Sequence, residues 1–255
     1  TQEGFELDLS YFDFYTFDKR RNFFNDKFIK LIGKPRQKND KITNYHYLVA
    51  GAMQRAFEKI VFHLLKILKS EGSKSKNLIL AGGAAMNCVF NGLLEKKKIY
   101  KNNYIPAYPD DLGVTIGAAY LANYRFNKSK KRKIYYEKHN YFGPGFTSDQ
   151  IKEEILKSKL KFTELKKNLN SEVAKFLSEG KLVGWFQGNM EFSHRALGNR
   201  SILADPRNPQ MKNIINKAIK FRESFRPFAP AVLEEEAHKI FEMNKNDKIY
   251  FMEKA

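Results

Sequence analysis

The stretch NLILAGGAAMNCVFNGLLEKKKI, residues 77–99, decides the class of fold that this sequence encodes. Its apolar run at 78–81 predicts a short buried strand. Gly82 and Gly83 predict a tight turn, and the residues from about Ala84 to Leu94 predict a helix directly after it. A strand, a tight turn and a helix in this order form the repeating unit of α/β folds.

The same alternation continues on both sides of this stretch. Residues 104–126 predict a strand, an acidic loop and a helix whose small residues, such as Gly113 and Gly117, allow another backbone to approach. Further helices are predicted at 45–69, from Thr147 or Ser148 onward, and at 211–219. Another helix is predicted to stop at Gly180, before a strand at 182–186. Residues 231–241 predict a buried segment that runs into a helix. Both halves of the chain are therefore predicted to be α/β.

A basic stretch without apolar periodicity separates the two halves. It contains KSKKRK at 128–133 and runs into the glycines of FGPGF at 142–146. We therefore predict a first domain over 1–127, a linker over 128–145 and a second domain over 146–255.

The chain of 255 residues is strongly basic, with 46 Lys and Arg against 28 Asp and Glu and a net charge of +18. Such a charge predicts an anionic partner, although many of the lysines are scattered over amphipathic segments and need no ligand to explain them. The single cysteine, Cys88, excludes an intrachain disulfide and a thiolate metal site. We find no secretory signal and no apolar run of membrane-spanning length, so we expect a cytoplasmic protein without a membrane partner.

Two clusters of basic residues follow the predicted linker. They lie in GNMEFSHRALGNRSILADPRNP, residues 188–209, and in NKAIKFRESFRPFAP, residues 216–230. Arginine pairs with phosphate through two hydrogen bonds at once, and apolar residues between the cations are typical of a pocket wall. We therefore predict one polyanion pocket, with Lys220 and Arg222 on one face of an extended segment. Its predicted residues are Arg195, Arg200, Lys220, Arg222 and Arg226, with Lys217, Asn199 and Ser201 as further ligand-binding residues.

The alternative for these cations is local ion pairing. Glu191, Asp205, Glu223 and the glutamates at 234–236 are the available partners. Residues 185–230 contain 8 Lys and Arg against 3 Asp and Glu, so local pairing cannot neutralise all of them.

Two further constellations are candidates for ligand binding. Gly82, Gly83 and Asn87 follow a predicted strand at the start of a helix, where backbone N–H groups bind anions, although glycines in such turns also serve geometry alone. Asp110 and Asp111 precede the next helix, where they either cap it or bind a hard cation.

Three stretches together resemble the O-carbamoyltransferases of nodulation-factor and antibiotic biosynthesis. They are LAGGAAMNCVFNGLL at 80–94, PAYPDDLGVTIGAAYLAN at 106–123 and the segment at 183–236. The resemblance implies the C-terminal part of an actin-like (ASKHA) ATPase-fold domain followed by a YrdC-like α/β domain. It also implies that Lys220-x-Arg222-x-x-x-Arg226-Pro227 corresponds to the Lys-x-Arg signature of the YrdC-like domain.

The resemblance implies a two-step reaction. The YrdC-like domain would form carbamoyl-adenylate from carbamoyl phosphate and ATP with Mg²⁺, releasing pyrophosphate. The actin-like domain would transfer the carbamoyl group to the hydroxyl of a sugar or natural-product acceptor, releasing AMP. The resemblance makes Asp111 the candidate ligand of Fe²⁺ or another divalent metal, with Asp110 as the second choice.

The chain departs from the family pattern in three ways, one of which is that the end of the YrdC-like domain is absent. Ser193 and His194 stand where the family usually has Gly-Pro. The N-terminal half of the family, with its His-x-x-x-His metal pair, has no counterpart here, so we expect a fragment or a split protein that works with a companion N-terminal chain. A protein related to tRNA modification or another nucleic-acid-binding protein, and a non-catalytic partner subunit, remain alternative functions, although we find no nucleic-acid-binding motif.

Overall fold

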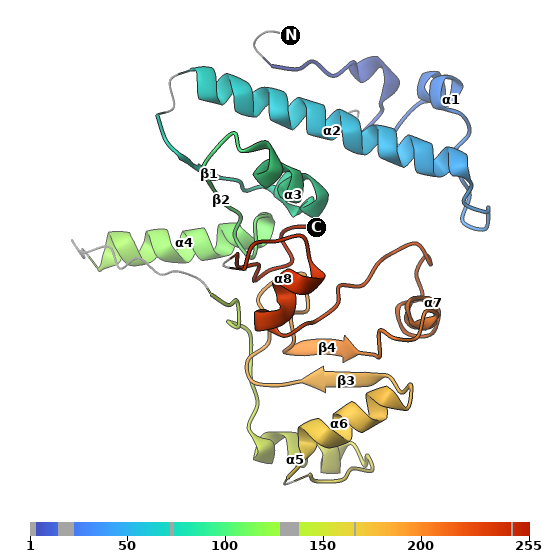
Figure 1. Cartoon of the computed structure of the whole chain (residues 1–255), viewed down its shortest axis with the longest axis vertical. Helices are drawn as coiled ribbons and strands as arrows, with labels where there is room; N and C mark the ends of the chain where they lie inside the picture. Colours follow the sequence, from blue (N-terminus) through green and yellow to red (C-terminus); the bar gives the residue numbers. More distant parts are fainter. Residues whose placement is uncertain (1–3, 15–22, 72–73, 128–137, 166, 246) are drawn as a thin grey trace. The chain divides into compact units, whose positions relative to one another are not determined.

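The computed structural model describes residues 4–14, 23–71, 74–127, 138–165, 167–245 and 247–255 (Figure 1). Contacts divide the chain into two compact units. Unit 1 comprises Thr1–Leu78 and Leu94–Asn102, and unit 2 comprises Ile79–Leu93 and Asn103–Ala255.

Unit 1 is built around α2 (Asn44–Ser70), the longest helix in Figure 1. The helix predicted at 45–69 is therefore confirmed. Thr43 caps it in a capping box with His46. Apolar side chains along this helix are covered unevenly, since Leu65 is buried whereas Met53 is 70% exposed.

The remaining helices of unit 1 are short. A 3₁₀ turn (Leu9–Tyr11) precedes α1 (Asp26–Ile32), and the side chain of Asn25 caps α1 by accepting the N–H groups of Lys27 and Phe28. The ring of Phe28 lies 5.5 Å from that of Phe12 and 5.5 Å from that of Phe24, which gives this part of the unit an aromatic core.

The opening stretch of the sequence forms a strand, a turn and a helix, but with shifted limits. Strand β1 (Asn77–Ile79) pairs with β2 (Asn102–Tyr104) in a two-stranded sheet, and β1 ends two residues before the predicted strand does. The helix predicted from about Ala84 to Leu94 is confirmed in part, because this segment is helical but is not one continuous α-helix. A 3₁₀ turn (Gly83–Met86) comes first, and α3 (Cys88–Lys97) begins later because the side chain of Asn87 accepts the N–H of Phe90.

The acidic loop leads into α4 (Asp111–Phe126), as predicted. A Cβ atom at Gly113 would lie 2.5 Å from the carbonyl oxygen of Tyr108, so this glycine does permit a close backbone approach. A Cβ atom at Gly117 would meet no described residue within 4 Å, so a close approach at Gly117 remains a prediction.

The second half of unit 2 contains a β-hairpin with helices before it. Thr147 caps α5 (Ser148–Lys157), and Gly180 has a φ of +80° after the end of α6 (Leu169–Ser178), which packs against β3 (Val183–Phe186). Strand β3 pairs antiparallel with β4 (Arg200–Leu203) in the register Val183–Leu203 to Phe186–Arg200. The predicted cap, glycine stop and strand are confirmed.

The segment after β4 is less regular than predicted. Helix α7 (Met211–Ile215) continues as a π-helical turn (Asn216–Lys220), which confirms a helix at 211–219. The segment at 231–241 was predicted to be buried, but Leu233 is 67% exposed. Only a 3₁₀ turn (Glu234–Glu236) and α8 (Ala237–Ile240) form there, because three successive glutamates favour the solvent over a core.

A hydrophobic cluster in unit 2 joins the two halves of the sequence. Its buried members Ala107, Tyr108 and Phe251 contact partly buried apolar side chains from α4 and from the loop between β3 and β4. These partners are Leu112, Ile116, Phe192 and Leu197.

The chain is thus mixed α/β, as predicted, and the strands among the described residues form two-stranded sheets. The more specific actin-like and YrdC-like predictions and the domain limits remain predictions. Residues 128–137 of the predicted linker lie outside the described residues. In the part of the chain that the structure describes, no helix has the length and apolar character that crossing a bilayer requires.

Candidate functional site

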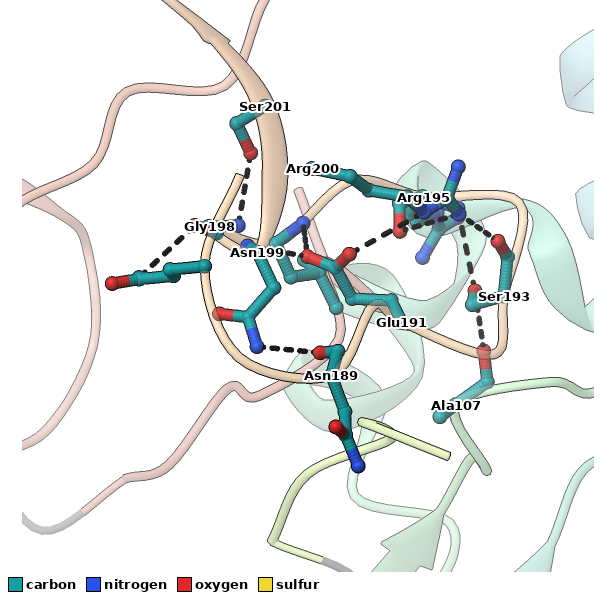
Figure 2. Close-up of polar contacts among 11 residues, drawn as sticks. Ala107, Asn189, Glu191, Ser193, Arg195, Gly198, Asn199, Arg200 and Ser201 are labelled. Atoms are coloured by element: carbon teal, nitrogen blue, oxygen red, sulfur yellow. Dashed lines mark hydrogen bonds and ion pairs between the residues drawn. The ribbon is translucent and has the colours of Figure 1, made fainter. Parts of the chain in front are cut away.

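The loop between β3 and β4 is folded around a buried carboxylate, that of Glu191 (Figure 2). Its Oε1 accepts the backbone N–H groups of Leu197, at 2.6 Å, and Asn199, at 2.9 Å. These two bonds fix the turn around Gly198, which has a φ of +110°. The side chain of Ser201 accepts the N–H of Gly198, and Asn199 donates its side-chain amide to the carbonyl of Asn189.

The carboxyl group of Glu191 is held ionised. Burial raises its pKa and is the largest single influence. Hydrogen bonds from backbone N–H groups, chiefly that of Asn199, and the positive charge of Arg200 together outweigh burial and leave the pKa below its ordinary value.

Arg200 is the cationic partner of this carboxylate. Its Nε lies 3.3 Å from Oε2 of Glu191, an ion pair without hydrogen-bond geometry. Its Nη2 donates to the carbonyl oxygens of Ser193 and, at 3.4 Å, of Arg195. Its Nη1 makes no hydrogen bond to any described residue, so two N–H groups of Arg200 are left for a ligand.

Arg195 lies in the same loop and is largely occupied by backbone. Nη1 donates to the carbonyls of Phe251, at 2.8 Å, and Met252, at 2.6 Å, and Nη2 donates to the carbonyl of Met86, at 3.0 Å. Arginine has five N–H donors, so two remain. Arg195 therefore ties three separate segments of unit 2 together.

Arg222 and Arg226 gather around a different residue, the buried Asn216. Arg222 Nε donates to Oδ1 of Asn216 at 2.6 Å, and Nδ2 of Asn216 donates to the carbonyl of Arg226 at 3.0 Å. The guanidinium of Arg222 also lies 4.7 Å from the ring centre of Phe228, and Arg226 pairs with Glu223 at 3.0 Å.

The structure thus brings the predicted cations into two groups. Arg195 and Arg200 both form hydrogen bonds with Ser193, whereas Arg222 and Arg226 both form hydrogen bonds with Asn216. A single pocket that contains all four arginines remains a prediction. The expected face of alternating cations was wrong, because Lys220 ends a π-helical turn and Phe221 has a left-handed φ of 48° before Arg222. Lys217 and Lys220 are both exposed.

Local ion pairing, the alternative for these cations, accounts for part of the cluster. It occurs between Arg200 and Glu191, between Arg207 and Asp205, and between Arg226 and Glu223. Asn199 and Ser201, predicted as ligand donors, have the structural contacts within the loop given above.

The backbone at Gly82 has the geometry of a tight turn, but only some of its hydrogen-bond donors are left for an anion. Gly82 has a φ of +94°, which favours glycine, and its N–H donates to the carbonyl of Pro109 at 2.5 Å. Asn87 uses its side chain to cap α3. Both groups are therefore engaged within unit 2, and the predicted anion site at Gly82, Gly83 and Asn87 remains a prediction.

The two acidic residues before α4 differ in their surroundings. Oδ2 of Asp110 lies 2.6 Å from Nε2 of His194, and its Oδ1 is buried without a hydrogen-bond partner among the described residues. Asp111 is exposed. Among the described residues of the chain, no three His, Cys, Asp or Glu side chains lie close enough together to bind one metal ion. The described side chains alone therefore do not make a metal site.

Comparison with known proteins identifies the family. A model described as the carbamoyltransferase N-terminus matches residues 4–120, and one described as the carbamoyltransferase C-terminus matches residues 174–255. The chain belongs to the carbamoyltransferase family. The loop with Glu191, Arg195 and Arg200 lies in the C-terminal match, and Met86, Asp110 and Asp111 lie in the N-terminal match.

The chain spans 30–40% of the length of three similar relatives. An uncharacterized protein of Synechocystis is 39% identical over 248 residues, which cover 94% of the chain and 40% of that relative. Nodulation protein NolNO of Sinorhizobium fredii is 40% identical over 210 residues, 82% of the chain and 30% of the relative. Nodulation protein NolO of Bradyrhizobium diazoefficiens is 36% identical over 210 residues, 82% of the chain and 38% of the relative.

Sequence reasoning missed the roles of three residues in this candidate site. Glu191 was considered only as an ion-pair partner, His194 only as a departure from the family pattern, and Asn216 not at all. The position of Glu191 between Met190 and Phe192 was a usable signal, because an acid flanked by apolar residues is buried only when it is paired.

Proposed function

We propose that the chain is part of an ATP-dependent O-carbamoyltransferase, and that its cationic loop takes part in forming carbamoyl-adenylate. The observation that carries this proposal is the loop between β3 and β4, where a buried carboxylate fixes Arg200 and leaves its Nη1 for an anion. Membership of the carbamoyltransferase family supplies the class of reaction.

Atom balance defines what the proposed site must hold. Water and carbamoyl phosphate give carbamate and inorganic phosphate. A carbamate oxygen then attacks the α-phosphorus of ATP, forming carbamoyl-adenylate as pyrophosphate leaves. In the second step an acceptor hydroxyl attacks the carbamoyl carbon, the hydroxyl proton is lost, and AMP leaves.

The first step needs fixed cations, because it brings several negatively charged groups together. Arginines that are already positioned stabilise the developing charge without reorganising, and losing one such donor costs roughly 10²–10³ in rate. Arg222 suits this role, since Asn216 and the ring of Phe228 hold its guanidinium while its Nη1 makes no hydrogen bond to a described residue. Lys217, Lys220 and Arg226 are the neighbouring cations of the proposed site.

Mg²⁺ with ATP, a divalent metal at Asp110 or Asp111, and a sugar or natural-product hydroxyl acceptor complete the proposal. A metal at the acidic pair requires ligands beyond those that the described residues bring together. We therefore propose that a companion N-terminal polypeptide contributes to that site, and that the protein acts in the cytoplasm without a nucleic-acid partner.

Calorimetric titration of ATP and of carbamoyl phosphate into the chain tests the proposed anion site. Arg222→Ala should weaken binding of ATP by about 1–3 kcal/mol, the cost of one charge-assisted bond to a partly buried anion. Arg207→Ala is the matched control, because Arg207 is 74% exposed and pairs with Asp205; it should change binding by less than about 0.5 kcal/mol. Equal small losses in both variants would show a diffuse positive field in place of a site.

A further inference from the structure

Glu191 has an environment that folding alone does not require of an acid. Its side chain has no solvent-exposed surface, although it lies in a loop between two short strands. One oxygen accepts two backbone N–H groups and the other faces Arg200 Nε at 3.3 Å. A neutral residue could fill this space, so the charge calls for a separate explanation.

The carboxylate determines two features of the loop at once. Through Leu197 and Asn199 it fixes the turn that leads into β4, where Arg200 is the first residue. Through Oε2 it attracts the guanidinium itself. Arg200 Nη2 then binds the carbonyl of Ser193, and Ser193 Oγ donates to the carbonyl of Ala107 at 3.1 Å (Figure 2).

We propose that Glu191 is a positioning residue of the anion site: its carboxylate holds the Leu197–Arg200 turn and the Arg200 guanidinium in place before a ligand arrives. This rests on the proposed function, because the anion is taken to be carbamoyl phosphate or ATP. The ion pair with Glu191 also favours binding. An unpaired arginine would lose side-chain conformational entropy when it binds an anion, whereas Arg200 has already lost it in the ion pair.

The variant Glu191→Gln separates the two roles of the side chain. Its amide oxygen can still accept the N–H groups of Leu197 and Asn199, so the turn is retained. The amide nitrogen would face Arg200 Nε, so a donor meets a donor and the attraction is lost. Asp205→Asn is the matched control, because it removes the carboxylate from the exposed pair with Arg207.

Two measurements on the whole chain test the proposal. The first is the rate at which phenylglyoxal modifies each arginine, followed by mass spectrometry of the peptides; the second is the Kd for carbamoyl phosphate. Glu191→Gln should speed the modification of Arg200 several-fold and raise the Kd about 10-fold, the equivalent of one charge-assisted hydrogen bond. Asp205→Asn should speed the modification of Arg207 alone and leave the Kd within about twofold.

A third variant tests whether Glu191 acts through Arg200. If it does, the double variant Glu191→Gln with Arg200→Gln binds carbamoyl phosphate no more weakly than Arg200→Gln alone. Additive losses would overturn the proposal, and so would faster modification of Arg200 with an unchanged Kd. A separate outcome concerns the proposed function. If the parent chain binds neither ATP nor carbamoyl phosphate, while the phenylglyoxal reactivity of Arg200 still depends on Glu191, the proposed function fails, and with it this role of Glu191.

Hydrogen exchange in the unmodified chain tests the same idea without any substitution. The backbone amides of Leu197 and Asn199 should exchange slowly without ligand. Adding carbamoyl phosphate should lower their exchange rates by less than about twofold. Fast exchange that becomes slow on binding would mean that the ligand orders the loop, which contradicts a turn held in advance.

Discussion

Arginine side chains in the second half of the chain differ in how many N–H groups the protein itself uses. Arg195 gives three N–H groups to backbone carbonyls, and the exposed Arg207 gives its Nε and Nη2 to the carboxylate of Asp205. Arg200, beside a buried acid, has an Nη1 without a hydrogen-bond partner among the described residues. Arginines with the same formal charge therefore differ in what they can offer to an anion.

The buried acid beside Arg200 gives a pH dependence whose sign follows from its pKa. The folded protein holds the pKa of Glu191 below its ordinary value of 4.5. Its ionised form therefore stabilises the fold fully above about pH 4.5, and this stabilisation is lost as the pH falls through the lower, folded-state pKa. At neutral pH, Glu191→Gln should lower the free energy of unfolding by about 1–3 kcal/mol.

Thermal unfolding at a series of pH values checks this expectation. The difference in Tm between the parent chain and Glu191→Gln should be largest near pH 7 and should shrink towards about pH 3. A difference that stays constant over this range would show that the charge of Glu191 does not contribute to stability.

Helix α4 shows at the level of one element how two glycines on the same helix differ. Gly113→Ala should destabilise the protein by about 1–3 kcal/mol, because its Cβ would lie 2.5 Å from the carbonyl oxygen of Tyr108. Gly117→Ala is the control on the same helix, with nothing within 4 Å of the added atom. It should stabilise the protein by up to about 1 kcal/mol through helix propensity. Urea unfolding of both variants measures these changes, and equal effects would contradict the packing at Tyr108.

Elements with local signals could be predicted from the sequence, and those set by distant contacts could not. Thr147 and Gly180 mark the limits of their helices through their own chemistry. The start of α3 was misplaced because a helix was expected directly after the turn at Gly82 and Gly83, whereas the cap at Asn87 sets its start.

The predicted site shows the same division. That cations gather after residue 188 follows from composition. The partners of Arg200, Arg222 and Arg226 lie within ten residues of them, but those of Arg195 come from contacts that span the chain. Arg195 bonds to carbonyls 56, 57 and 109 residues away. Such pairings depend on the fold as a whole, and neither spacing nor charge count contains them.

At the scale of the whole molecule, these long-range contacts predict how the chain behaves after proteolytic cleavage. We expect limited proteolysis to cut first within 127–140, the basic stretch without periodicity. The two pieces should nevertheless remain together under native conditions, because Arg195 bonds to Met86 and Ser193 to Ala107 within unit 2. Size-exclusion chromatography of the cut protein, followed by denaturing electrophoresis, would show this. Pieces that separate without denaturant would contradict these contacts.

The bond between Asn91 and Glu253 sets an order of events during synthesis on the ribosome. The buried amide of Asn91 donates to the carbonyl of Glu253, 162 residues later, and the N–H of Ala255 donates to the carbonyl of Cys88 at 3.0 Å. At roughly 5–20 residues per second, about 8–30 seconds pass between the emergence of the two partners. Throughout that interval the carbonyl of Cys88 and one N–H of Asn91 bond to water in place of these partners. We therefore expect the packing around the start of α3 to be completed only after residue 255 has left the ribosome.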